Sequence, residues 1–320
     1  MKNLFKISFL SLITFLAIIG TSCENDDNDD NAIDNSISGI ASKTANLSIL
    51  VQALNKVDLA NTLKSSGTYT VFAPTNEAFT TFLAATPYAT INDVPDAVLK
   101  EILLNHVIGS VKKSTDLSTG YIKTLGKGAA STTNTLSMFV NIGSNGVTLN
   151  GVSMVTTADI LASNGVIHIV DDVINLPTIV THALANPNFT SLVGALTSAG
   201  QPDFVSILSG TGPFTVFAPT NDAFTALNIE LAPGGIAGVS SSNLTKVLKY
   251  HVVSGGILAS SLTDGQVVQT LETPQTFTIQ LTNGAKIKDA NNRVSTIIAT
   301  DVQCANGVIH VLDKVLLPIL

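Results

Sequence analysis

The stretch YTVFAPTNEAF at residues 69–79 returns almost unchanged as FTVFAPTNDAF at residues 214–224. In each copy, alternating residues predict a strand, and the proline then withdraws a backbone donor and ends it. Thr75 or Asn76 can cap a following helix with a side-chain oxygen, and Glu77 places negative charge at the positive end of that helix. The stretch therefore predicts a strand, a corner and a capped helix, twice in one chain.

The repeat extends over most of the chain. His106 recurs as His251, and His168 recurs as His310, each histidine in a matching apolar segment. A period of about 140 residues is far too long for a solenoid, so the copies are tandem domains. The segments that we expect are a signal peptide at residues 1–22, an acidic tether at 23–35, a first domain at 36–177 and a second domain at 178–320.

Periodicity gives a coarse picture of each domain. Apolar residues between 47 and 63 recur at three-to-four spacing, which predicts one face of an amphipathic helix. Asn-Gly at residues 164–165 and 306–307 predicts tight two-residue turns with positive φ angles. The apolar run at 166–170 predicts a buried strand, and Ser- and Thr-rich alternating segments predict further antiparallel strands.

Together these motifs closely resemble those of fasciclin-like domains. The resemblance rests on the two FAPTN stretches, the histidine segments LLNHVIGS and LKYHVVSGG, and the two NGVIH segments, and it covers about residues 36–320. It implies an α+β chain of two tandem fasciclin-like domains, each an antiparallel β-sandwich or wedge of about seven strands with several helices. The family is known for adhesion and matrix attachment rather than for catalysis.

The first residues indicate export. Lys2 and Lys6 precede an apolar run at residues 7–19, which is shorter than the roughly 20 residues that span a bilayer. Small residues then lead into Cys23, which resembles a bacterial lipoprotein processing site and implies lipidation of Cys23. The acidic residues that follow resemble the surface-export signal of Bacteroidetes-type lipoproteins, so we expect an outer-membrane protein that faces the cell exterior. An ordinary secreted protein and a plain spacer are the alternatives.

Composition and motifs disfavour catalysis and nucleic-acid binding. The net charge is −7 without a basic patch, so nucleic acid is not an expected partner. No HxH, HExxH, CxxC or GxSxG pattern occurs, so we expect no metal, no cofactor and no enzyme. The paired histidines are interpreted as core residues bonded to the backbone and Cys304 as a small buried residue. His182 is expected at the surface or as a helix cap.

The family resemblance supplies candidate adhesive residues. An Asp-Ile pair before the second signature is linked to integrin binding in animal members, and Asp159 with Ile160 matches it. The tyrosine-histidine motif is matched by Tyr250 with His251. The other copy departs from each motif, and a strand end and a core position are the alternative interpretations of these residues.

Two classes of function remain open at this point. The first is a lipid-anchored attachment protein that binds matrix, surface proteins or a second copy of itself. The second is a glycan-binding accessory lipoprotein of a polysaccharide-uptake system, although the chain has no Trp and only four Tyr to stack on sugars. Exposed tyrosines on one face would favour the second class, and a plain structural spacer is a further alternative.

Overall fold

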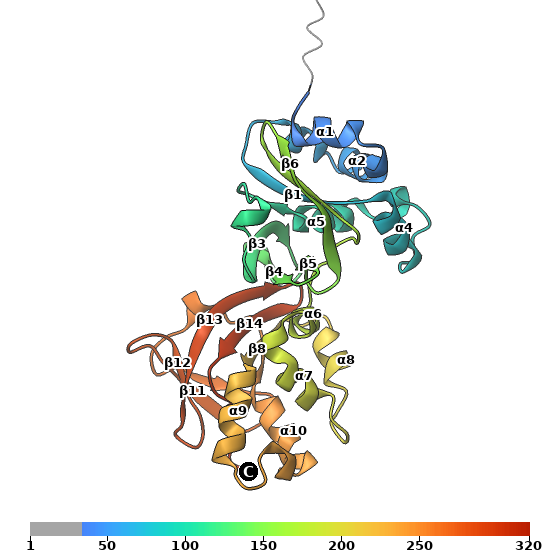
Figure 1. Ribbon diagram of the computed structural model, residues 1–320. Helices are drawn as coiled ribbons and strands as arrows, with labels where there is room; N and C mark the ends of the chain where they lie inside the picture. Colours follow the sequence, from blue (N-terminus) through green and yellow to red (C-terminus); the bar gives the residue numbers. More distant parts are fainter. Residues whose placement is uncertain (1–33) are drawn as a thin grey trace, which may run out of the picture. The chain divides into compact units, whose positions relative to one another are not determined.

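The computed structural model describes residues 34–320, which form one compact unit containing two domains of the same architecture (Figure 1). The predicted signal peptide, the lipidation site at Cys23 and nearly all of the acidic tether lie outside the described residues. None of the described helices combines the length and the apolar character that a bilayer crossing requires.

Each domain contains one seven-stranded sheet, which confirms the predicted number of strands. The first sheet has the order β2-β1-β7-β6-β5-β4-β3 and the second has the equivalent order β10-β11-β12-β13-β14-β8-β9. The strands of the first domain are β1 Tyr69–Pro74, β2 Val107–Ile108, β3 Gly120–Lys127, β4 Thr135–Gly143, β5 Gly146–Leu149, β6 Ser153–Ala162 and β7 Gly165–Val170. Those of the second are β8 Phe214–Pro219, β9 Val252–Ser254, β10 Val267–Gln269, β11 Thr276–Gln280, β12 Lys286–Lys288, β13 Val294–Cys304 and β14 Gly307–Leu312.

One pair in each sheet is parallel, which the antiparallel prediction missed. β1 runs parallel to β7 and β8 runs parallel to β14, whereas the other pairs are antiparallel. The parallel pair joins the two ends of the domain sequence, because β1 follows the first helices and β7 is the last strand. β7 is buried along nearly its whole length, as its apolar sequence predicted.

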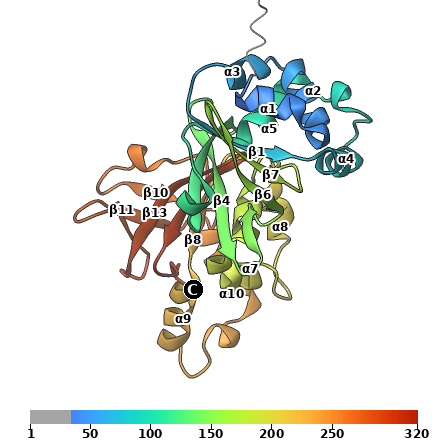
Figure 2. The ribbon, with the colours of Figure 1, turned by 45° about the horizontal axis from the view of Figure 1, so that its top comes forward.

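Five helices accompany each sheet, and α1 and α2 lie side by side next to the first one (Figures 1 and 2). In the first domain they are α1 Ile37–Lys43, α2 Ser48–Lys56, α3 Ala60–Lys64, α4 Asn76–Ala84 and α5 Asp96–Asn105. In the second they are α6 Ile179–Ala185, α7 Thr190–Leu196, α8 Phe204–Ser209, α9 Asn221–Glu230 and α10 Ser241–Tyr250. Short 3₁₀ turns include Ser114–Asp116 and Ala259–Ser261.

The single amphipathic helix predicted for residues 47–63 is wrong. The segment divides into α2 and α3 because Asp58 adopts a left-handed backbone with φ of 61°. A residue in that conformation cannot continue a right-handed helix. The apolar periodicity survives the break because both helices pack against the same core.

The quoted stretch forms the predicted strand, corner and helix. Thr75 is the residue that caps α4, since its Oγ1 accepts a hydrogen bond from the Ala78 N–H at 3.2 Å. Asn76 has a different role, because its side chain accepts from the Ile49 N–H at 2.9 Å and donates to the Ala45 carbonyl at 3.2 Å. The asparagine therefore ties the start of α2 to the start of α4.

The predicted tight hairpin turns form one residue earlier than expected, at residues 163–164 and 305–306, so each glycine begins the second strand of its hairpin. Asn164 is absent from the left-handed region, and its buried side chain instead accepts from the Ile37 N–H and donates to the carbonyls of Leu63 and Ser65. Asn306 makes the equivalent three bonds in the second domain. Each asparagine thus joins the last hairpin to the first helices.

The glycine of each pair is required by a close approach of two strands. A Cβ atom on Gly165 would lie 1.9 Å from the Tyr69 carbonyl oxygen, and one on Gly307 would lie 2.1 Å from the Phe214 carbonyl oxygen.

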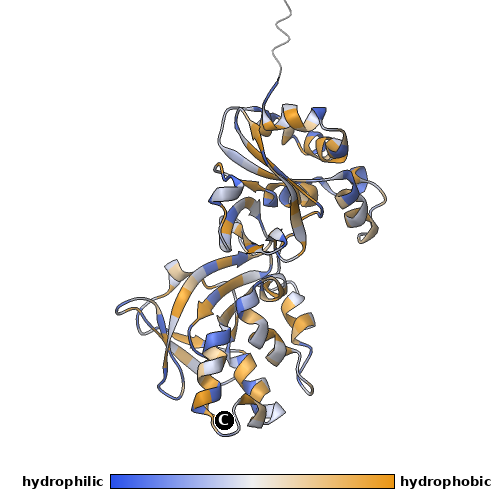
Figure 3. Cartoon of the chain, viewed as in Figure 1, coloured by the Kyte–Doolittle hydropathy of each residue, from blue (hydrophilic) through white to orange (hydrophobic). Residues whose placement is uncertain are grey.

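Hydrophobic residues follow the strands and the helices in both domains (Figure 3). Each domain has two clusters of buried side chains, one shared by helices and strands and one formed mostly by strands.

Candidate functional site

The predicted Asp-Ile pair lies at an irregularity in β6. The pairing of β6 with β7 shifts register between Thr157 and Ile160, and Asp159 has a φ of 62°. The Asp159 N–H donates to His168 Nδ1 at 3.2 Å, and His168 Nε2 donates to the Lys112 carbonyl at 2.8 Å. His168 therefore holds the distorted backbone of β6 against the loop that precedes Ser114.

The carboxylate of Asp159 is occupied inside the domain. It accepts hydrogen bonds from the Ser114 N–H at 2.8 Å and the Ser114 Oγ at 2.5 Å. These two bonds hold the pKa of Asp159 below its ordinary value. Ile160 packs against the core, so the side chain that projects into solvent is the next one, Leu161, at 63% exposure.

The second domain repeats this arrangement, but the residue equivalent to Leu161 is buried there. Asp301 has a φ of 55°, and its carboxylate accepts from the Ala259 N–H at 2.8 Å. Gln303 stands at the position of Leu161, since it faces Val308 as Leu161 faces Val166. Gln303 is only 1% exposed, because the first domain covers it.

Tyr250 and His251 lie inside the second domain. The Tyr250 hydroxyl donates to the Thr276 carbonyl at 2.7 Å and accepts from the Ala290 N–H at 3.0 Å. Burial raises the pKa of Tyr250 to about 12. Both side chains are almost completely buried, so in the folded domain they join α10 to β11 and the C-terminal segment instead of forming an open contact surface.

The histidines at the ends of α5 and α10 share one geometry. Nδ1 of His251 donates to the Val247 carbonyl at 2.7 Å, and Nε2 accepts from the Leu316 N–H at 2.9 Å. His106 makes the same two bonds in the first domain. Burial lowers the pKa of both imidazoles to about 4, so both rings are neutral near pH 7.

The two domains contact each other through β3 and β4 of the first and β13 of the second. Lys123 Nζ donates to the Asp301 carbonyl at 2.8 Å, and the Gln303 N–H donates to the Ser137 Oγ at 3.0 Å. The Tyr121 hydroxyl accepts from Asn186 Nδ2 at 3.2 Å. The same Asp-containing segment that is open in the first domain is therefore a covered surface in the second.

The position predicted for His182 is wrong. Its ring is fully buried at the domain contact, with its centroid 5.3 Å from that of Tyr121. Burial lowers the pKa of His182 to about 3, and the backbones of Ser137 and Gln303 approach the ring without meeting hydrogen-bond geometry. Cys304 is buried beside this contact, as predicted, and burial raises the pKa of its thiol.

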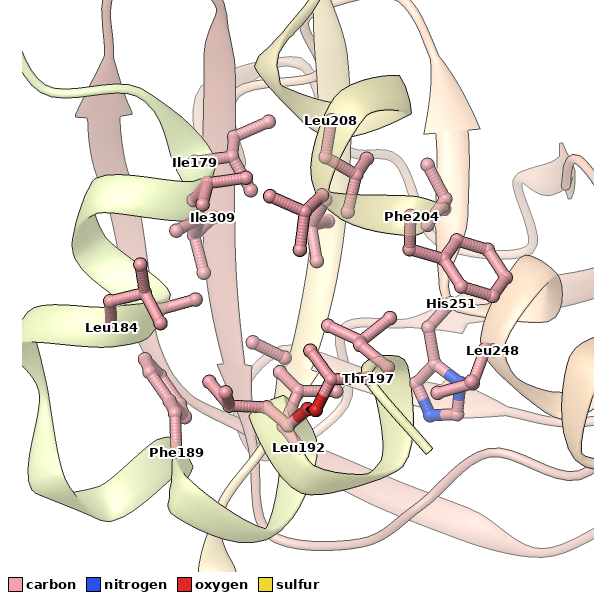
Figure 4. A pocket seen from close by; sticks show the side chains of 18 of the residues that line it. Ile179, Leu184, Phe189, Leu192, Thr197, Phe204, Leu208, Leu248, His251 and Ile309 are labelled. Atoms are coloured by element: carbon pink, nitrogen blue, oxygen red, sulfur yellow. Dashed lines mark hydrogen bonds between the residues drawn. The ribbon is translucent and has the colours of Figure 1, made fainter. Parts of the chain in front are cut away.

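An apolar cavity lies between the helices and the sheet of the second domain (Figure 4). Ile179, Leu192, Phe204 and Leu248 are among its lining residues, and His251 lines it with both ring nitrogens already bonded. Its volume of about 40 Å³ is little more than the share of one water molecule and far below that of a typical ligand pocket. The cavity is best explained as loose packing.

The charged and thiol side chains do not assemble a metal site in the part of the chain that the structure describes. No group of three or more His, Cys, Asp and Glu residues converges there. The short connection between the domains predicts that they touch, but sequence reasoning missed the exposure of Leu161 and the surfaces through which the domains meet. The sequence feature that could have indicated this surface is the difference between the copies at one strand position, where the first has the apolar Leu161 and the second has the polar Gln303.

Comparison with known proteins relates this architecture to a protein family. The fasciclin domain model matches residues 45–177 and 187–318. Protein sll1483 of Synechocystis sp. is 43% identical over 143 residues, which are 44% of this chain and 73% of that protein. Human periostin is 29% identical over 266 residues, which are 81% of this chain but only 29% of periostin.

A solved structure agrees with these matches. The FAS1 domain pair from the insect cell adhesion molecule fasciclin I aligns with a TM-score of 0.50 at 18% identity, covering 84% of this chain and 95% of that one. At this identity the likeness concerns the fold. With the family model covering both domains, the chain belongs to the fasciclin domain family, as a tandem pair.

Proposed function

We propose that this chain is a cell-surface attachment protein that acts through protein–protein contacts and has no catalytic role. The observation that supports the proposal is the burial of the four tyrosines. Tyr69, Tyr88 and Tyr121 are half-buried and Tyr250 is buried, so none offers an open platform for a sugar ring. The large hydrophobic side chains that are exposed in the described residues are all aliphatic.

The relatives support the same class of function. The insect protein whose domain pair has this fold is named a cell adhesion molecule, and this chain consists of the same kind of pair. Matrix or surface proteins, or a second copy of the chain, are the partners that we infer.

The proposal includes membrane anchoring through a lipid on Cys23, with the protein in the outer membrane and facing the exterior. The acidic residues after Cys23 support surface export of the Bacteroidetes type. In the full chain, Cys23→Ala should move the protein from the membrane to the soluble fraction without changing its melting temperature. Retention in membranes after a high-salt wash contradicts the anchor.

Binding of residues 34–320 to an array of matrix proteins, surface proteins and polysaccharides tests the attachment function. This fragment contains every described element of both domains. Signal on proteins alone is the expected result. Selective polysaccharide signal contradicts the proposal and supports glycan capture instead.

A further inference from the structure

The contact between the two domains joins unlike surfaces. The first domain contributes the outer face of β3 and β4, here called the β3–β4 face, with Tyr121, Lys123 and Ser137. The second contributes the end of β13, here called the β13 edge, with Asp301 and Gln303. Such a contact is heterologous, because two different surfaces meet. The first domain therefore has a free equivalent of the β13 edge, and the second domain has a free equivalent of the β3–β4 face.

The unused surfaces can be identified by sheet pairing. Val140, Leu149 and Ser153 form one row across the first sheet, and Ile279, Ile287 and Ser295 form the equivalent row across the second. The neighbouring pairs then align Tyr121 with Val267, Lys123 with Gln269, and Ser137 with Thr276. These three residues of the second domain are here called the β10–β11 face.

The counterpart of the β13 edge is the end of β6, here called the β6 edge, with Asp159 and Leu161. β6 pairs with β5 only at Ser153 and Met154, so its remaining length has an open edge among the described residues. An open strand edge presents backbone donors and acceptors to a partner. In the second domain the same edge is where Lys123 and Ser137 dock.

We propose that the β6 edge of one chain binds the β10–β11 face of a second copy of this chain. The contact between chains repeats the contact within the chain and continues it head to tail. The inference deepens the proposed attachment function, on which it rests, by naming the partner.

The residues on the two free surfaces are chemically suited to this contact. Leu161 and Val267 are 63% and 65% exposed, although both are large aliphatic residues. Their counterparts in the existing contact, Gln303 and Tyr121, are covered or half-buried. Burying exposed aliphatic side chains in a contact is favourable.

Two polar bonds of the existing contact, those made by Lys123 and Ser137, have potential replacements on the free surfaces. Gln269 Nε2 donates to the Thr270 and Gln275 carbonyls of its own domain, and by exchanging one of these bonds it can donate to the Asp159 carbonyl, as Lys123 does to the Asp301 carbonyl. The Thr276 hydroxyl can accept from the Leu161 N–H, as Ser137 does from the Gln303 N–H. In the first domain, the position equivalent to His182 is occupied by the half-buried Ile40. The His182 ring makes no hydrogen bond, so an apolar side chain at this position favours contact with Val267.

Sedimentation velocity of residues 34–320 over a concentration series tests the proposal. The wild type should show a mass that rises with concentration. Leu161→Lys and Val267→Lys should each remove one of the two surfaces and weaken assembly more than about tenfold, because each buries an unpaired ammonium group. Ile229→Lys is the matched control, since Ile229 is 73% exposed on α9, outside both surfaces.

Mixing the two variants gives the decisive result. Leu161→Lys retains a working β10–β11 face and Val267→Lys retains a working β6 edge, so an equal mixture should form dimers and stop there. A wild type that stays monomeric, a Leu161→Lys variant that assembles normally, or a mixture without dimers overturns the proposal. Protein signal on the array without self-association overturns this inference alone. Self-association with selective polysaccharide capture overturns the attachment function alone.

Discussion

Acidification should destabilise both domains before the carboxylates titrate, because His106 and His251 must stay neutral to hold their bonds. Each Nδ1 already carries the proton that it donates to a carbonyl, so a second proton must go to Nε2. Nε2 accepts the Ile174 N–H in one domain and the Leu316 N–H in the other. Protonation would place two donors face to face and break that bond.

The size of the effect follows from proton linkage. The pKa of each ring falls from 6.5 to about 4 on folding, so the unfolded chain binds the proton first as the pH drops. Stability is therefore complete above the unfolded pKa and is lost as the pH falls through 6.5 toward 4. Between about pH 7.5 and pH 5.5 each histidine should remove about 1.3 kcal/mol from the free energy of unfolding. The buried His182, whose pKa is about 3, adds a similar loss to the second domain.

Guanidinium unfolding of residues 34–320, followed by circular dichroism at both pH values, measures this loss. We expect the second domain to lose at least twice as much as the first, because it contains His182 and His251 and because burial also lowers the pKa of its His310. His251→Gln removes one titrating group and should reduce the pH dependence of the second domain by about 1.3 kcal/mol, whatever its effect at neutral pH.

NMR titration of the histidine rings gives the independent check. A folded-state pKa near 6.5 for His106 or His251, or an unfolding free energy unchanged between the two pH values, would refute the role assigned to Nε2.

Three further changes test other parts of the structure by chemical unfolding. Asn164→Ala should destabilise the first domain by about 3 kcal/mol through the loss of three hydrogen bonds, with Asn306→Ala doing the same in the second; losses below about 1 kcal/mol would show that water replaces these bonds. Gly307→Ala should cost about 3 kcal/mol because β8 and β14 must separate, and a neutral result would contradict the close approach. His182→Leu should stabilise the domain contact by about 1 kcal/mol by removing an unpaired polar ring, so a net loss would indicate bonds that the geometry does not contain.

The repeated stretches and the histidine segments were enough to predict the family, and the resemblance then implied the number of strands in each sheet. The strand, the helix cap and the burial of the four repeat-paired histidines depend on local rules. An alternating run makes a strand, a proline ends it, a threonine caps the next helix, and a histidine inside an apolar segment must find partners in the backbone.

The sequence could not predict contacts between distant segments. Asn164 resembled a turn residue, but its turn lies against α1 and α3, about 100 residues or more earlier in the chain, so its amide makes buried bonds instead. The break at Asp58 was hidden because both resulting helices keep their apolar residues toward one core.

The candidate site illustrates the same division. The sequence identified Asp159 and Ile160 by resemblance, whereas the difference at the next residue, Leu161 in one copy and Gln303 in the other, carried no prediction. Only the tertiary structure decided that the first domain covers Gln303 and leaves Leu161 exposed. The physical reason is that exposure depends on which surfaces dock, and two nearly identical copies carry the same local signals whether or not a neighbour covers them.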